Sequence, residues 1–117
     1  MKILITGVAG FIGFSLAKTL LAQNHHVYGI DNLNNYYDVK LKKKRLLFLK
    51  KNYKKKFIFN KIDISVSKKI DKYFNAKNFD KVFHLAAQAG VRYSLTHPEK
   101  YLNSNLVGFS NIIFNCK

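Results

Sequence analysis

Short apolar runs alternate along this chain with longer segments in which apolar and polar residues mix. The apolar runs are Lys2–Thr6, His26–Ile30, Phe57–Ile62 and Lys81–Ala86, and their length suits strands rather than helices. The mixed segments between them have the length and spacing of amphipathic helices. Strands that alternate with helices are typical of βαβ units, so the pattern predicts an α/β fold with a parallel sheet.

The mixed segments predict four helices. We expect them near Phe11–Gln23, Val39–Asn52 and Ser67–Asn75, and from Pro98 into Ile112–Phe114. Ser67 is a candidate N-cap, and Pro98 suits the first turn of a helix. The positions expected to face the core are Ile12, Leu16, Leu20 and Leu21 in the first helix and Leu46, Leu47 and Leu49 in the second, whose lysines should face water.

The right-handed crossovers typical of parallel strands predict the strand order 3-2-1-4. This is the N-terminal half of a Rossmann-like doubly wound sheet, built as one domain from residues 1–117. Val82–Ala87 is apolar throughout, as expected of a strand in the middle of a sheet. Here it would be an edge, so we expect the domain to be truncated before a fifth strand. Such an edge attracts a second copy or a complementing C-terminal half.

Composition narrows the cellular setting. With 117 residues the chain is long enough for one domain with a core. Its single cysteine, Cys116, excludes a disulfide framework and is compatible with a reducing compartment. No apolar run has the roughly 18–20 residues of a membrane span. We therefore expect a cytoplasmic protein without a membrane partner.

The charge of the chain raises a different hypothesis. The formal net charge is +15, and strongly basic proteins attract nucleic acids. The basic residues concentrate between Lys40 and Lys56, and nearly all are lysine. The chain is also rich in Asn, Ile, Phe and Tyr, a joint bias typical of AT-rich coding sequence. Because no nucleic-acid motif accompanies the lysines, we expect no nucleic-acid partner, and a basic nucleic-acid-binding module is kept as an alternative.

Three glycines mark the strongest candidate site. Gly7, Gly10 and Gly13 follow the first apolar run and open the first predicted helix. Glycines at such positions permit a tight turn, let the backbone approach a pyrophosphate and let the helix pack closely on the strand. Asp31 ends the second apolar run, where a carboxylate accepts hydrogen bonds from ribose hydroxyls and repels a 2′-phosphate. The pattern therefore predicts an NAD site rather than an NADP site.

Further candidates lie where the third and fourth apolar runs end. Asp63 and Ile64 could flank an adenine ring, although Asp63 also fits an ordinary turn. The small residues Ala86 and Ala87 would let a cofactor pass close over the end of the fourth strand. Because the carboxyl ends of parallel strands meet at one edge of the sheet, these residues should lie near the glycines.

The histidines and tyrosines form no recognisable catalytic or metal site. His84 lies in a mostly apolar run and is expected to be structural, whereas His25 and His26 lack further ligands at suitable spacing. A Tyr-x-x-x-Lys pair can supply a catalytic base and a cation one helical turn apart. Two such matches begin at Tyr36 and Tyr73, but neither follows a fifth strand, where the catalytic pair belongs. We therefore predict no catalytic residues and no metal site.

Taken together, these motifs resemble the extended short-chain dehydrogenase/reductase superfamily, in its nucleotide-sugar epimerase/dehydratase branch. The resemblance is carried by Lys2–Gly13, Gly29–Asp38 and His84–Ser94, the last continued by Asn105–Phe109. It covers essentially the whole chain. Within the branch, these stretches are more similar to UDP-glucuronate 4-epimerases than to UDP-glucose or UDP-galacturonate epimerases.

The resemblance implies a set of residues around NAD. The pyrophosphate would be held by Gly7, Gly10, Phe11, Ile12 and Gly13. The adenosine ribose would lie against Asp31, Asn32, Leu33, Asn34 and Asn35, and the adenine against Asp63 and Ile64. The nicotinamide side would be lined by Leu85, Ala86, Ala87 and Gln88, with Ser104 or Asn105 nearby. The loop with Arg92 and Ser94 would approach a UDP-sugar, where Arg92 would face an acidic sugar or a diphosphate.

The resemblance also implies a reaction. In the family, a tyrosine takes a proton from the sugar 4-hydroxyl while NAD takes hydride from C4, and the hydride then returns to the opposite face. The catalytic Tyr-x-x-x-Lys follows a fifth strand, which we expect this chain to lack together with the lobe that binds UDP. We therefore expect the NAD-binding portion of a 4-epimerase that is inactive by itself. The alternatives are a half-protein that complements a separate partner and a degenerate fragment without function.

Overall fold

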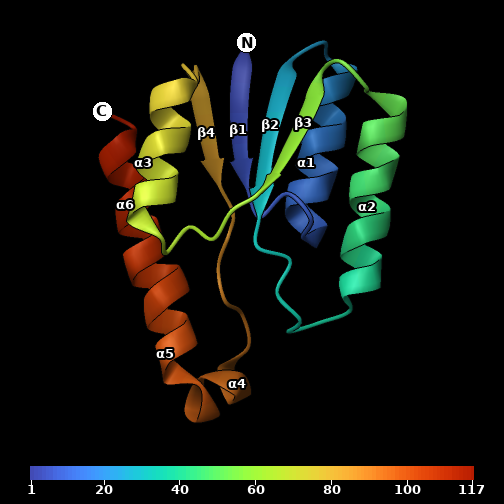
Figure 1. Cartoon of the computed structure of the whole chain (residues 1–117). Helices are drawn as coiled ribbons and strands as arrows, with labels where there is room; N and C mark the ends of the chain where they lie inside the picture. The colour runs from blue at the N-terminus through green and yellow to red at the C-terminus, as the bar shows by residue number, and fades with distance from the viewer.

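The computed structural model describes all residues of the chain, 1–117. Its four strands are β1 (Lys2–Thr6), β2 (His26–Asp31), β3 (Phe57–Lys61) and β4 (Lys81–His84). They form one parallel sheet in the order β3-β2-β1-β4 (Figure 1). The predicted fold class and strand order are therefore confirmed. All four carboxyl ends reach the same edge of the sheet, at the bottom of Figure 1.

Helices cover both faces of the sheet (Figure 1). On one face lie α1 (Phe11–Ala22) and α2 (Val39–Asn52), and on the other α3 (Ser67–Ala76) and α6 (Phe109–Asn115). The predicted C-terminal helix begins at Pro98, as expected, and runs through α5 (Pro98–Tyr101) and the π-helix η1 (Leu102–Gly108) into α6. A short helix that the sequence pattern did not predict, α4 (Val91–Thr96), precedes it.

The alternation of side chains along β1 divides the interior into two cores. Ile3 and Ile5 pack towards α1 and α2 in one cluster of buried residues. Leu4 faces the opposite way, in a second cluster with Ile70 of α3 and Ile112 of α6. Successive side chains of a strand point to opposite faces, so one pentapeptide anchors both helical layers.

Two of the predicted core positions are wrong. Ile12 is 66% exposed and Leu47 is 65% exposed. On α1 the buried positions are Gly13, Ala17 and Leu21, and on α2 they are Lys42, Leu46 and Leu49. Residues three and four apart share one helical face, and Ile12 and Leu47 each lie beside that face rather than on it. The prediction that the lysines of α2 face water therefore fails at Lys42.

The start of α3 also differs from the prediction. Ser67 is the first helical residue, and Val66 occupies the N-cap position without a side-chain hydrogen bond. The helix instead follows a turn in which Asp63 Oδ1 accepts hydrogen bonds from the backbone N–H and the hydroxyl of Ser65, at 2.9 and 2.7 Å. The turn is thus organised by an aspartate upstream of the predicted serine.

β4 lies at the edge of the sheet, as the sequence pattern predicts. The strand ends at His84, two residues earlier than expected. Leu85 and Ala86 leave the ladder and instead donate backbone hydrogen bonds to the Thr6 hydroxyl. None of the helices has the length and apolar character needed to cross a membrane.

Candidate functional site

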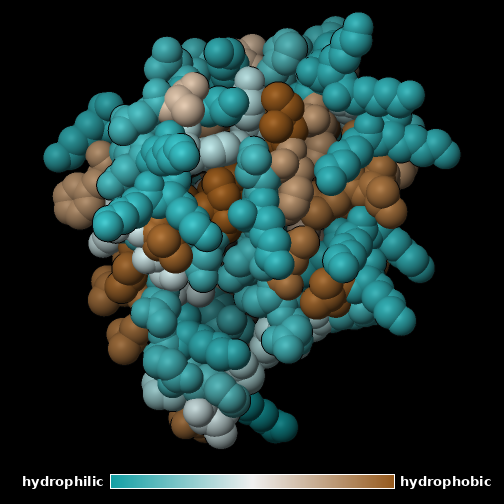
Figure 2. Space-filling view, viewed as in Figure 1, coloured by the Kyte–Doolittle hydropathy of each residue, from teal (hydrophilic) through white to brown (hydrophobic).

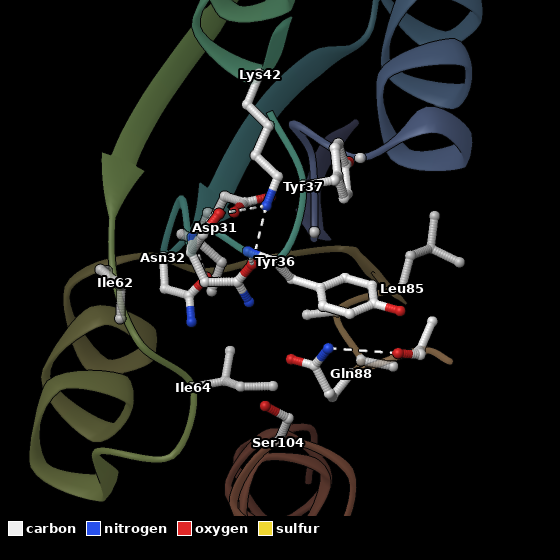
Figure 3. Close-up of a pocket in the computed structure, with 17 residues that line it drawn as sticks. Asp31, Asn32, Tyr36, Tyr37, Lys42, Ile62, Ile64, Leu85, Gln88 and Ser104 are labelled. Carbon is white, nitrogen blue, oxygen red and sulfur yellow. Dashed lines mark hydrogen bonds between the residues drawn. The ribbon is translucent and has the colours of Figure 1, made fainter. Parts of the chain in front are cut away.

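A cleft of about 260 Å³ opens at the carboxyl ends of the strands. Its walls come from the turn after β1, the loop after β2, the segments after β3 and β4, and η1 (Figure 3). Eleven of the residues predicted to bind cofactor line it: Gly7, Gly10, Asp31, Asn32, Asn34, Ile64, Leu85, Ala86, Ala87, Gln88 and Ser104. Segments far apart in the sequence therefore meet as the strand-end argument predicts.

Two glycines of the turn are required by close packing. Gly7 has φ of +72°, and a Cβ there would lie 2.9 Å from the backbone N of Ala86. A Cβ at Gly13 would lie 2.1 Å from the carbonyl O of Gly7, which is far inside van der Waals contact. Only glycine therefore lets the turn lie against the end of β4 and α1 pack against the turn.

The N-terminus of α1 faces the cleft without a capping side chain. Gly10 is its N-cap, and no acidic residue lies in its first turn. The first helical bond runs from the Phe14 N–H to the Gly10 carbonyl, at 2.9 Å. The first N–H groups of a helix have no intrahelical partner and carry positive partial charge. Those of Phe11, Ile12 and Gly13 are therefore available to an anion, while the Phe11 side chain is 75% exposed.

Asp31 holds the turn and the following loop together. Its Oδ2 accepts a hydrogen bond from the Ala9 N–H at 3.1 Å, and its Oδ1 accepts one from the Leu33 N–H at 2.8 Å. Leu33 has φ of +53°, so the loop turns sharply beside the carboxylate and Leu33 itself packs against the core. Each carboxylate oxygen keeps acceptor capacity for a ligand.

The sequence analysis missed three polar residues that line the cleft: Tyr36, Tyr37 and Lys42. Lys42 reaches in from α2 and is only 5% exposed (Figure 3). Its Nζ donates to the carbonyl O and the Oδ1 of Asn34, at 2.9 and 3.1 Å, and lies 4.4 Å from the centre of the Tyr37 ring. The only available signal was the i, i+4, i+7 spacing of Lys42 with the buried leucines of α2.

A polar clamp fixes the segment after β4. Asn105 of η1 accepts a hydrogen bond from the Gln88 N–H at 2.8 Å and donates one to the Gln88 carbonyl at 3.1 Å. Both backbone groups of Gln88 are thus satisfied by one amide, and the Gln88 side chain lies against the cleft (Figure 3). Asn105 itself does not line the cleft, so its contribution is to position the segment.

The other predicted residues lie outside this cleft. Asn35 and Asp63 line an adjoining polar cavity of about 190 Å³, which shares Asn32 and Ser104 with the cleft. Arg92 is exposed, and the Ser94 hydroxyl donates to the Val91 carbonyl; neither lines either cavity. The structure therefore gathers most of the predicted cofactor residues but not the predicted sugar-binding pair.

The chemistry of the cleft is that of a ligand with one anionic part and one hydroxyl-bearing part. The uncapped start of α1 offers N–H donors, and Asp31 offers a carboxylate acceptor at the neighbouring strand end. Ile62, Ile64 and Leu85 provide apolar walls on either side (Figure 3). A helix N-terminus at the edge of a parallel sheet, beside such a carboxylate, is the arrangement in which doubly wound proteins bind dinucleotides.

Comparison with known proteins extends the sequence resemblance. Protein CapI of Staphylococcus aureus is 50% identical over 113 residues, which are 97% of this chain and 33% of that protein. A UDP-glucuronate 4-epimerase of Thermodesulfobacterium geofontis is 46% identical over 110 residues, which are 94% of this chain and 33% of the relative. The chain thus spans about a third of the length of the curated relatives it matches.

Among solved structures, a UDP-glucuronic acid 4-epimerase mutant of Bacillus cereus superposes with a TM-score of 0.87 at 35% identity. The match covers 99% of this chain and 36% of that one, and that structure contains NAD and UDP-4-deoxy-4-fluoro-glucuronic acid. The family model described as GDP-mannose 4,6 dehydratase matches residues 4–117. Because that match takes in nearly every residue, the chain belongs to the GDP-mannose 4,6 dehydratase family.

Proposed function

We propose that the cleft binds NAD and that residues 1–117 are the NAD-binding portion of a nucleotide-sugar 4-epimerase. The observation that carries the proposal is the meeting of an uncapped helix N-terminus with Asp31 and the segment after β4 around one cleft. Relatives and solved structures that match nearly the whole chain include UDP-glucuronate 4-epimerases, and one of these structures contains NAD.

The residues present fit a dinucleotide. In this proposal the N–H groups of Phe11, Ile12 and Gly13 bind the pyrophosphate, and the absence of a Cβ at Gly10 leaves room for it. Asp31 accepts the ribose hydroxyls, with Asn32, Asn34 and Asn35 beside it. The adenine lies along Ile62 and Ile64, with Asp63 at its rim. The nicotinamide passes over Leu85, Ala86 and Ala87, near Gln88 and Ser104.

The proposed reaction class is epimerisation at C4 of a UDP-sugar. When bound, NAD would supply the hydride acceptor for C4 and return the hydride to the opposite face. The contribution of this chain is to bind and orient, because neither Tyr-x-x-x-Lys match fits a catalytic pair. Tyr73 is buried in a core cluster, and Tyr36 precedes α2 instead of lying on a helix with Lys40. We therefore propose that residues 1–117 alone turn over no UDP-glucuronate.

The substrate is proposed as a UDP-sugar in the complete enzyme, UDP-glucuronate first, because several relatives are UDP-glucuronate 4-epimerases. Arg92 and Ser94 remain the candidate residues on this chain for contact with the sugar nucleotide. Arg92 is exposed and free to reach a ligand beyond the cleft. In a complete homologue, Arg92→Ala should weaken substrate binding and spare NAD binding; unchanged substrate affinity would remove this assignment.

Calorimetric titration of the chain with NAD tests the binding proposal. We expect saturable 1:1 binding of NAD, and loss of at least about tenfold in affinity in Asp31→Lys, because a charge-assisted hydrogen bond is replaced by a repelling charge. Asp71→Lys makes the same charge change on the exposed face of α3 and should bind NAD like the parent. A chain that is folded by circular dichroism but does not bind NAD would contradict the proposal.

The same pair of variants separates this function from the basic-module alternative. DNA binding that depends on the lysines should fall steeply with salt and should not decrease in Asp31→Lys. Loss of NAD binding with unchanged DNA binding therefore assigns the cleft to the dinucleotide. Tight DNA binding at physiological salt by a chain that ignores NAD would favour the alternative.

The partner proposal rests on exposed apolar side chains. Leu102, Leu106, Phe109, Ile113 and Phe114 of the C-terminal helix are exposed, and brown atoms stand out along that side of the molecule in Figure 2. Exposed apolar patches and free sheet edges favour association. We propose that a second copy or a chain carrying the rest of the fold covers this face, in a reducing cytoplasm compatible with the exposed thiol of Cys116. Light scattering of the purified chain tests the self-association.

A further inference from the structure

Lys42 is a buried cation without a charged hydrogen-bond partner. It is 5% exposed, and both acceptors of its Nζ, the carbonyl O and the Oδ1 of Asn34, are neutral. Lysine is almost never fully buried unless it is paired. An ammonium group carries three donors, and these two bonds use two of them. The third donor is therefore available to a ligand in the cleft that Lys42 lines (Figure 3).

A second cation of α2 adds to the positive potential at this end of the cleft. Arg45 donates from one guanidinium nitrogen to the Ala9 carbonyl at 2.9 Å and to the Tyr37 hydroxyl at 3.3 Å. It thereby joins α2 to the glycine turn, next to the Ala9 N–H that Asp31 accepts. Burial lowers the pKa of Lys42, and the Asp31 carboxylate opposes that shift, so the two groups influence each other electrostatically.

Asp31 is the only carboxylate that lines the cleft. In the proposed complex, its place is beside the adenosine ribose, where a 2′-phosphate would meet its negative charge. Without that charge, a 2′-phosphate would meet the free donor of Lys42 and the field of Arg45 instead. Charge-assisted hydrogen bonds to phosphate are among the strongest in proteins.

We propose that Lys42, supported by Arg45, forms a latent site for the 2′-phosphate of NADP that the Asp31 carboxylate masks. The inference rests on the proposed NAD function and adds its specificity-determining pair, Asp31 against Lys42. A neutral residue at position 31 then converts an NAD-selective cleft into one that also takes NADP.

The test measures dissociation constants for NAD and NADP at one fixed salt concentration. Asp31→Asn should tighten NADP binding by at least about tenfold relative to the parent chain, since one charge repulsion is replaced by one charge-assisted bond. Adding Lys42→Met should remove that gain, whereas adding Lys42→Arg should keep most of it. Lys43→Met, which removes the same charge from the exposed face of α2, should leave the gain intact.

The ratio of the two dissociation constants distinguishes ligand contact from a merely structural role. If Lys42 only orders the loop through Asn34, Lys42→Met weakens NAD and NADP equally, and the inference is overturned. It is also overturned if Asp31→Asn binds NAD but gains no affinity for NADP, an outcome that leaves the proposed function standing. Failure of the folded parent to bind either dinucleotide overturns the proposed function first.

Discussion

The Thr6 hydroxyl lies 2.7 Å from Nδ1 of His84, where the paired strands β1 and β4 end. The same Oγ1 accepts hydrogen bonds from the N–H groups of Leu85 and Ala86, each at 3.0 Å. With two donors directed at it, Oγ1 gives its own proton to Nδ1, so the His84 ring is neutral and carries its proton on Nε2. This one hydroxyl therefore holds the segment that leaves β4 against the start of the cleft.

Removal of the hydroxyl should cost stability. Thr6→Val keeps the size of the side chain but leaves the Ala86 N–H without its acceptor, and we expect a loss of about 1–3 kcal/mol in the free energy of unfolding. Urea denaturation measures it. Thr6→Ser keeps the oxygen and should lose much less; a Thr6→Val chain as stable as the parent would show that the hydroxyl is dispensable.

The same contact predicts a loss of stability in mild acid. Burial lowers the pKa of His84, so an unfolded chain takes up a proton near pH 6.5 that the folded chain resists. The contribution of His84 is therefore fully present above about pH 6.5 and is lost as the pH falls towards its folded pKa. A protonated Nδ1 would also oppose the donors already directed at Thr6.

Urea midpoints measured between pH 7.5 and pH 5 would check this. We expect His84→Gln to flatten the pH dependence, because the titrating group is gone. His26→Gln changes an exposed histidine and should leave the dependence as in the parent. An equal slope in the parent and in His84→Gln would assign the acid sensitivity to other groups.

The glycine turn predicts opposite outcomes for two alanine substitutions. A Cβ at position 13 would lie 2.1 Å from the Gly7 carbonyl O, so Gly13→Ala should destabilise the chain by at least about 1–3 kcal/mol through overpacking. At position 10 the nearest atom would be the same oxygen at 3.2 Å, so Gly10→Ala should fold. We expect Gly10→Ala to weaken NAD binding, since the new methyl group lies on the wall of the cleft. Thermal denaturation and NAD titration together separate the two effects.

The Asn105 clamp predicts an effect on binding without a ligand contact. Asn105→Ala frees both backbone groups of Gln88, and we expect weaker NAD binding with a loss of about 1–2 kcal/mol in stability. Asn78→Ala, at an exposed loop position, is the matched control. If Asn105→Ala binds NAD like the parent, the position of the Gln88 segment does not limit affinity.

Local pattern was sufficient for the elements and for much of the cleft. Val39–Asn52 was predicted with its observed bounds, and β1 and the start of α1 follow directly from the apolar run and the glycines after it. Parallel strands place their carboxyl ends together. For that reason Gly7, Asp31 and Ala86, distant in sequence, were expected in one place and line one cleft.

Side-chain roles that depend on a neighbouring layer were less predictable. Ile12 and Leu47 were expected in the core because they are apolar, but a helix buries only the stripe that its sheet covers. Ser67 was expected to cap α3, whereas the preceding turn is organised by Asp63. In each case the residue type allowed two environments, and packing chose between them.

The sequence by itself determined the order of the elements, the glycine turn and the carboxylate that ends β2, because periodicity and backbone sterics are local properties of the chain. Only the tertiary structure decided that Lys42 is buried in the wall of the cleft and that Thr6 meets His84 across two strands. Those contacts depend on how α2 and β4 lie against β1 and its turn. Burial and hydrogen bonding between distant segments are set by the packed layers, and no stretch of sequence encodes them alone.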